Sequence, residues 1–144
     1  MSRRETIARW LAVLAWATVI SLLSTEWFTG DRTASVLLPL LAALFPSAST
    51  TELANLHQHI RKAAHFAEYL VLSVLLYRAL AGPRSWNLRA AGVALLLAAV
   101  YSGSDEFHQW YVPGRTAAIT DCLIDVSGAA AGQGLLAAWS RSKP

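Results

Sequence analysis

Residues 63–80 read AAHFAEYLVLSVLLYRAL, and this stretch decides the fold. It is apolar except for His65, Glu68 and Arg78, and it is long enough to cross a bilayer, which takes about 17 to 25 helical residues. Ionisable side chains inside such a run are costly in lipid, so we expect them to face other helices or water. The stretch therefore predicts a membrane-spanning helix over about residues 61–80, with one polar face turned into a bundle.

The composition of the whole chain agrees with a membrane protein. Of its 144 residues, 55% are hydrophobic and only 15% are charged, against about 25% charged in ordinary soluble domains. This length is typical of one domain, so residues 1–144 are expected to form a single unit. Cys122 is the only cysteine, which excludes a disulfide within the chain.

Further apolar stretches predict spans over about residues 7–24, 88–108 and 118–139. The first is interpreted as a retained anchor rather than a signal peptide, because no small-x-small cleavage site follows it. Between the first and second spans, Ala34 to Phe45 is apolar but too short to cross, and it is broken by Pro39. The sequence thus predicts an all-α membrane protein with four transmembrane helices and one short re-entrant or interfacial helix.

The basic residues predict the orientation of the spans. With the N-terminus inside, the cytoplasmic side receives most of the 12 Lys and Arg, as the positive-inside rule expects. Both termini are then cytoplasmic. These residues flank spans instead of forming a basic patch with interleaved aromatics, so no nucleic-acid partner is expected.

Polar residues recur at helical spacing at one end of the last three spans. Each of three sets falls on or near one helix face: Arg61, Lys62, His65, Glu68 and Tyr69; Asp105, Glu106, His108 and Gln109; Asp121, Asp125, Gly128 and Gly132. The predicted topology brings all three to the outer end of the bundle, where they should meet in a pocket. Gly128 and Gly132 are interpreted as packing residues that let a neighbouring helix approach closely.

At these residues the sequence resembles the VanZ-like family. The resemblance rests on Arg61-Lys62-Ala-Ala-His65-Phe66-Ala-Glu68-Tyr69, Asp105-Glu106-Phe107-His108-Gln109, Pro113-Gly114-Arg115-Thr116 and Asp121-x3-Asp125-x2-Gly128-x3-Gly132. It covers about residues 61–134. It implies a small multi-pass protein of the bacterial cytoplasmic (inner) membrane. The founding member is associated with resistance to the glycopeptide antibiotic teicoplanin.

The preferred functional hypothesis is an enzyme that acts on a membrane lipid or lipid-linked cell-envelope substrate, by phosphoryl transfer or hydrolysis. Histidine suits acid–base work near neutral pH, with His108 as base or nucleophile and His65 as acid. The candidate catalytic residues are His65, Glu68, Asp105, Glu106, His108 and Asp121. The candidate substrate-binding residues are Arg61, Lys62, Tyr69, Gln109, Arg115 and Asp125, of which the cations would hold an anionic headgroup.

Other classes of function stay open at this stage. A divalent metal is a minor option, because the acidic and histidine residues offer oxygen and nitrogen ligands but no metal-binding motif. The same pocket could instead bind a lipid headgroup or an acylated glycopeptide without chemistry. Intramembrane His and carboxylate residues also serve proton relays, so a small proton-coupled module is the third alternative. The sequence defines neither a cofactor nor an oligomeric state.

Overall fold

The computed structural model describes residues 2–82, 86–111 and 119–142, and every regular element in these ranges is a helix. In chain order the elements are α1 (Arg3–Leu23), the short 3-10 helix η1 (Glu26–Phe28), α2 (Gly30–Leu44), α3 (Thr50–Ala81), α4 (Leu88–Trp110) and α5 (Ile119–Arg141). The all-α class predicted from the sequence is therefore confirmed.

Helix α3 is the longest element and begins well before the predicted span over residues 61–80. A capping box fixes its start: Ser49 Oγ accepts from the Glu52 amide at 3.3 Å, and Glu52 Oε2 accepts from the Ser49 amide at 2.7 Å. The helix ends at Gly82, whose φ of 69° suits glycine. Its 32 residues extend about 48 Å, which exceeds the roughly 30 Å of a hydrocarbon core.

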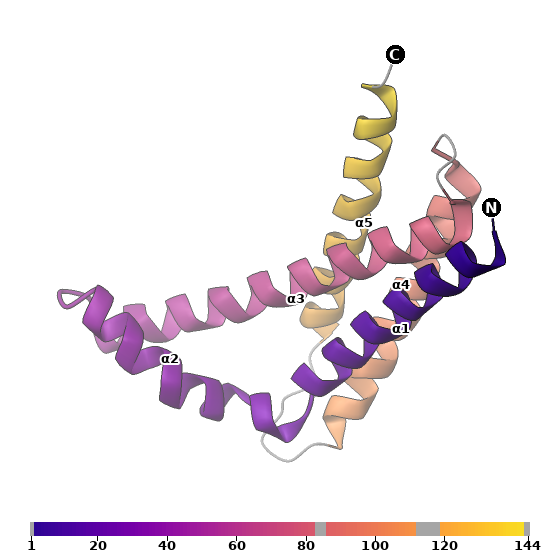
Figure 1. The fold of residues 1–144 in the computed structure, drawn as a ribbon. Coiled ribbons are helices and arrows are strands. Elements are labelled where there is room, and N and C mark those ends of the chain that lie inside the picture. The colour runs from indigo at the N-terminus through magenta and orange to yellow at the C-terminus, as the bar shows by residue number, and fades with distance from the viewer. Residues whose placement is uncertain (1, 83–85, 112–118, 143–144) are drawn as a thin grey trace.

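Helix α2 contains the short apolar stretch between the first and second predicted spans. Thr29 caps its start, and Pro39 lies within it. The helix packs against the first part of α3, where Thr33 Oγ1 and His57 Nε2 are 3.1 Å apart. Figure 1 shows α2 and the start of α3 as a hairpin that extends away from the other helices. A short helix is present at the predicted place, and its position in or on the bilayer stays a prediction.

The core of the bundle forms around α3, which contacts α1, α2, α4 and α5. Figure 1 shows α5 crossing α3 near the middle of the bundle. Small residues on α4 and α5 allow the helices to lie close together. The buried apolar residues of this core are Val13, Ile20, Tyr69, Leu72, Leu76, Tyr77, Ala79, Ala91, Ala94, Ala98 and Ala129.

Within the described residues, three helices are long and apolar enough to cross a membrane. They are Arg3–Leu23, Thr50–Ala81 and Thr120–Arg141. Helix α4, over the third predicted span, is not among them, and it carries Arg89 at its start and Asp105 and Glu106 near its end. The chain therefore has the helices of a membrane protein, and the count of four spans stays a prediction.

The crossing of α5 over α3 depends on two glycines. A Cβ atom added at Gly128 would overlap the carbonyl oxygen of Phe66, and one added at Gly132 would lie 2.8 Å from the carbonyl oxygen of Leu70. Backbone atoms cannot move aside as the end of a flexible side chain can. The packing role predicted for Gly128 and Gly132 is thus confirmed.

We expect Gly128→Ala to destabilise the protein by about 1–3 kcal/mol, because overpacking against a backbone forces the two helices apart. Gly134→Ala is the matched control, since nothing lies within 4 Å of a Cβ at that position of the same helix. The control should be neutral or stabilising, because alanine favours a helix over glycine. The free energy of unfolding in detergent measures both, and equal values for the two variants would contradict the close approach.

Candidate functional site

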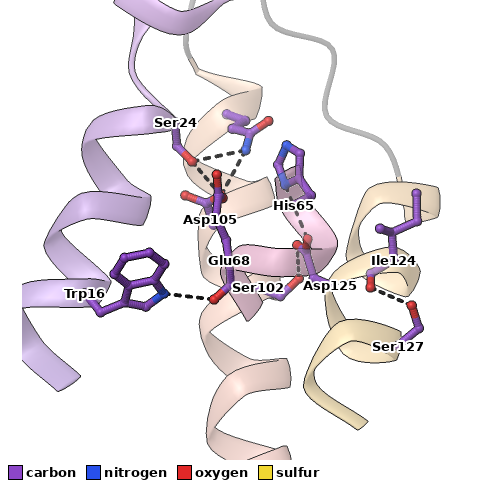
Figure 2. A network of polar contacts seen from close by, with 10 residues as sticks. Trp16, Ser24, His65, Glu68, Ser102, Asp105, Ile124, Asp125 and Ser127 are labelled. Carbon is purple, nitrogen blue, oxygen red and sulfur yellow. Dashed lines mark hydrogen bonds and ion pairs between the residues drawn. The ribbon is translucent and has the colours of Figure 1, made fainter. Parts of the chain in front are cut away.

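Asp125 of α5 is fully buried and joins three helices. Ser102 of α4 donates its hydroxyl to Asp125 Oδ2 at 2.7 Å. His65 Nδ1, from α3, lies 3.3 Å from Asp125 Oδ1 in an ion-pair contact that lacks the alignment of a hydrogen bond. Figure 2 shows the imidazole and the serine hydroxyl pointing at the same carboxylate. These three residues are called the Asp125 cluster.

Asp105 of α4 is the centre of a second group, the Asp105 cluster, and is only 6% exposed. Ser24, at the end of α1, donates its hydroxyl to Asp105 Oδ2 at 2.7 Å. Gln109 Nε2 donates to the same oxygen at 2.9 Å. Both donors are neutral, so this carboxylate is satisfied by hydrogen bonds rather than by a charge.

The two clusters share one face of α4, because Ser102, Asp105 and Gln109 follow each other at i, i+3 and i+7. Tyr69 of α3 is fully buried, and its hydroxyl has no hydrogen-bond partner among the described residues. Asp105 and Asp125 both act electrostatically on this hydroxyl. Tyr69 therefore lies near both carboxylates without a hydrogen bond to either.

Two further predicted residues surround His65. The acidic groups that act electrostatically on His65 are Asp125, Glu68 and Asp121. Trp16 Nε1 donates to the main-chain carbonyl of Glu68 at 2.9 Å and so fastens α1 to α3 beside the site. The structure thus gathers residues from all four of the long helices at this level of the bundle (Figure 2).

The predicted cations lie elsewhere. The guanidinium of Arg61 lies against Gly30, at the start of α2, and Lys62 is exposed. In the described part of the chain, neither forms an ion pair or hydrogen bond with the two clusters. Arg115, with the rest of the motif Pro113-Gly114-Arg115-Thr116, falls outside the described residues. Glu106 is partly buried on α4.

His108 lies on an exposed position of α4 and lines a groove of about 270 Å³ between α1 and α4. The other lining residues are Ser21, Tyr101, Ser104 and Asp105. The Asp105 cluster thus forms part of the wall of this groove, whereas Asp125 does not line it. The two predicted histidines therefore occupy different settings: His65 has a carboxylate partner, and His108 stands at an opening.

Sequence reasoning missed Ser24 and Ser102, which supply the shortest hydrogen bonds to the two carboxylates. Ser102 precedes Asp105 by three residues, so helical spacing could have placed it on the polar face. Ser24 caps the end of α1 after the uncharged stretch of residues 10–23, and no periodic signal identifies it. Serine is common in spans as a neutral residue, so its type alone does not indicate a site.

The described residues contain no group of three or more His, Cys, Asp or Glu side chains that could hold a metal ion. The divalent-metal alternative therefore finds no ligand set in that part of the chain. The chemistry open to the described site is hydrogen bonding and proton transfer by His65, His108 and the carboxylates.

Apolar helices of spanning length with carboxylates buried between them define an integral membrane protein with an internal polar site. Comparison with known families gives the particular group: residues 8–140 match VanZ/LLP1, and the chain belongs to this family. Searches of curated proteins and of solved structures gave no significant match. The resemblance found at the polar motifs is confirmed and extends over nearly the whole chain.

We expect Asp125→Ala to destabilise the protein by at least about 1–3 kcal/mol, because it leaves the buried Ser102 hydroxyl without its acceptor and the partly buried His65 without its ion-pair partner. Ser127→Ala, on the same helix, is the control. Its hydroxyl is exposed and bonds only to the carbonyl of Ile124 at 2.7 Å, so its removal should change stability by no more than about 0.5 kcal/mol. Denaturant titration in detergent gives the free energy of unfolding of the two variants. Equal values would show that the contacts of Asp125 do not hold the helices together.

Proposed function

We propose that this chain is a membrane-embedded enzyme that transfers or hydrolyses a phosphoryl group of an anionic lipid or lipid-linked cell-envelope substrate. The observation that supports this best is the contact between His65 and Asp125. A buried carboxylate on Nδ1 fixes the orientation of an imidazole and leaves Nε2 to exchange a proton with a substrate. His65 is then the general base, and Asp125 positions it without touching the substrate.

The proposed reaction balances with no cofactor. His65 Nε2 removes a proton from water or from an acceptor hydroxyl as its oxygen bonds to phosphorus. The bond from phosphorus to the leaving alcohol breaks, and the imidazolium returns the proton to that alcohol. The long, poorly aligned contact at 3.3 Å suits a resting site, because catalytic hydrogen bonds often tighten only when substrate binds.

Lys62 and Arg61 precede His65 by one helical turn, so they lie on the α3 turn next to it. In this proposal Lys62, which is exposed, meets the phosphate at the mouth of the site, whereas the Arg61 guanidinium lies against Gly30 of α2. Glu68 and Asp121 stay beside His65 and stabilise its protonated form. Arg115, which lies outside the described residues, is retained as a further candidate for headgroup binding.

The lipids that the site can reach depend on the side of the membrane on which it lies. We place it at the outer face of the cytoplasmic membrane, with four spans and both termini in the cytoplasm. This arrangement follows the distribution of Lys and Arg along the chain. It gives the polar clusters access to outer-leaflet lipids, and therefore to cell-wall precursors and to acylated glycopeptides such as teicoplanin. A role in resistance would follow from a change in such lipids.

The second candidate is a receptor that binds a lipid headgroup or an acylated glycopeptide without turnover. The observation that favours it is the burial of both carboxylates, which are satisfied by neighbours as in a rigid binding scaffold. The two functions differ in whether a product forms.

We expect purified wild-type protein to consume a phospholipid or lipid-linked phosphate from a total bacterial lipid extract. His65→Ala should slow this turnover by about 10²–10⁴-fold, as expected for loss of a general base. Asp125→Asn should slow it less and change its pH dependence, because the carboxylate acts through His65. Mass spectrometry of the lipids before and after incubation gives the rates.

His59→Ala is the matched control, because His59 is exposed on the same helix and its Nδ1 contacts only the carbonyl of Asn55. It should turn over lipid at the wild-type rate. Full activity in His65→Ala would exclude the proposed base. Activity lost only in His108→Ala would give that role to His108. A lipid that co-purifies without being consumed would support the receptor.

The orientation has its own test, for which Cys122→Ser removes the only native cysteine. In that background, His59→Cys should react with a membrane-impermeant maleimide in intact spheroplasts. Ser142→Cys should react only after the membrane is opened, because the C-terminus is proposed to be cytoplasmic. The reverse pattern would place the site on the inner face, and labelling of both in intact spheroplasts would contradict an even number of spans.

A further inference from the structure

The groove between α1 and α4 contains neither His65 nor Asp125, so the proposed reaction does not account for its lining residues. Its walls are Ser21 on α1 and Tyr101, Ser104, Asp105 and His108 on α4, around about 270 Å³. Ser21, Ser104 and His108 are exposed, so a molecule beside the helices can reach the groove from the side. None of its lining residues is a lysine or an arginine.

The hydroxyl protons of the groove are already committed to bonds within the protein. Tyr101 donates its proton to the carbonyl of Ala17 at 2.6 Å, so the Ser21 hydroxyl must donate in its 2.8 Å bond to the Tyr101 oxygen. Ser104 donates to the carbonyl of Tyr101 at 2.8 Å. Each hydroxyl oxygen therefore offers only lone pairs to a molecule in the groove.

Asp105 adds a carboxylate to these acceptors. Both of its hydrogen bonds within the described residues end on Oδ2, from Ser24 and Gln109, and no cation pairs with it there. Asp105 is only 6% exposed, and among the described residues its donors are neutral, so no described group supplies a counter-charge. A buried carboxylate in its ionised form is costly without a nearby opposite charge, so a cation bound in the groove would stabilise that form of Asp105.

We infer that this groove binds the primary ammonium of a phospholipid headgroup, as in an ethanolamine phospholipid. An ammonium carries three donors and a positive charge, which match three acceptor oxygens and the free side of the Asp105 carboxylate. A phosphate or a carboxylate would find a donor only in the imidazole of His108, and it would face the Asp105 carboxylate and the lone pairs of the hydroxyl groups. The inference rests on the proposed function and extends it. The reaction requires a phosphate in the lipid headgroup, and the groove would recognise an ammonium in the same headgroup.

Exposed aromatic residues support a position of the groove near the depth of lipid headgroups. They lie in η1 and at the end of α4: Trp27 at 69% exposure, Trp110 at 76% and Tyr111 at 71%. Such residues mark the membrane–water interface. Ser104 precedes Trp110 by about 9 Å of helix, so the groove begins just below that level. An ammonium that enters from the adjacent leaflet keeps its acyl chains in lipid.

The test is lipid selectivity measured without turnover. Protein in detergent is mixed with equal amounts of ethanolamine, choline and glycerol phospholipids that carry identical acyl chains, and the retained lipids are quantified by mass spectrometry. We expect the ethanolamine lipid to exceed the choline lipid by about tenfold, since the trimethylated headgroup keeps the charge but has no N–H donor. Asp105→Asn should reduce this ratio to about one, because it removes the charge. The oxygen of the new amide can still accept the hydrogen bonds from Ser24 and Gln109.

Ser104→Ala removes one acceptor but leaves the bonds of Asp105 intact, and it should reduce the ratio about two- to fivefold. It keeps the test decisive if Asp105→Asn does not fold. Ser127→Ala, whose hydroxyl is exposed on α5, should retain the wild-type ratio. Equal retention of the ethanolamine and choline lipids by wild type, or a preference for the glycerol lipid, would overturn the inference.

The His65→Ala variant separates this inference from the proposed function. It should lose turnover and keep the preference for the ethanolamine lipid, because His65 does not line the groove. Turnover that continues with no headgroup preference would overturn the ammonium site and leave the enzyme proposal intact. A wild-type protein that prefers the ethanolamine lipid but turns over no lipid would support the ammonium site and contradict the enzyme proposal.

Discussion

A fully buried carboxylate is the constraint on which the rest of this structure depends. Asp125 lies on α5 with no exposure, and its acceptors have to be met by groups from neighbouring helices. Ser102 and His65 meet them only if α3, α4 and α5 lie at one fixed separation. Gly128, one turn further along α5, allows that separation by letting the helix backbones touch. The close packing at Gly128 and the contacts of the Asp125 carboxylate thus favour the same separation of the helices.

Much of this arrangement could be predicted from the sequence. The helical spacing of residues and the free-energy cost of an ionisable side chain in lipid can both be read from short stretches of the chain. His65, Asp105 and Asp125 stand out as ionisable residues in apolar runs, and the spacing of Gly128 and Gly132 indicates a contact face. The early start of α3 was not predicted, although Ser49 and Glu52 carry the spacing of a capping box. Ser24 could not be predicted, because its role arises only when α1 packs beside α4.

The placement of Arg61 shows where one-dimensional patterns fail. It shares a helix face with His65, which suggested a common pocket, but α2 folds back on α3 and receives its guanidinium at Gly30. The residues that share a face of a long helix can therefore belong to different contacts along its length. The 32 residues of α3 serve two neighbours in turn, first the hairpin partner α2 and then the bundle.

The two buried carboxylates have similar exposure but different partners, and that difference divides the site into two parts. Asp125 meets an imidazole that can take a proton, so any charge it carries has a partner within the protein. Among the described residues, Asp105 meets only a serine hydroxyl and an amide, and it borders an opening. The first arrangement suits proton transfer by a fixed group. The second suits the ammonium proposed above, which would balance a charge on Asp105 from outside the protein.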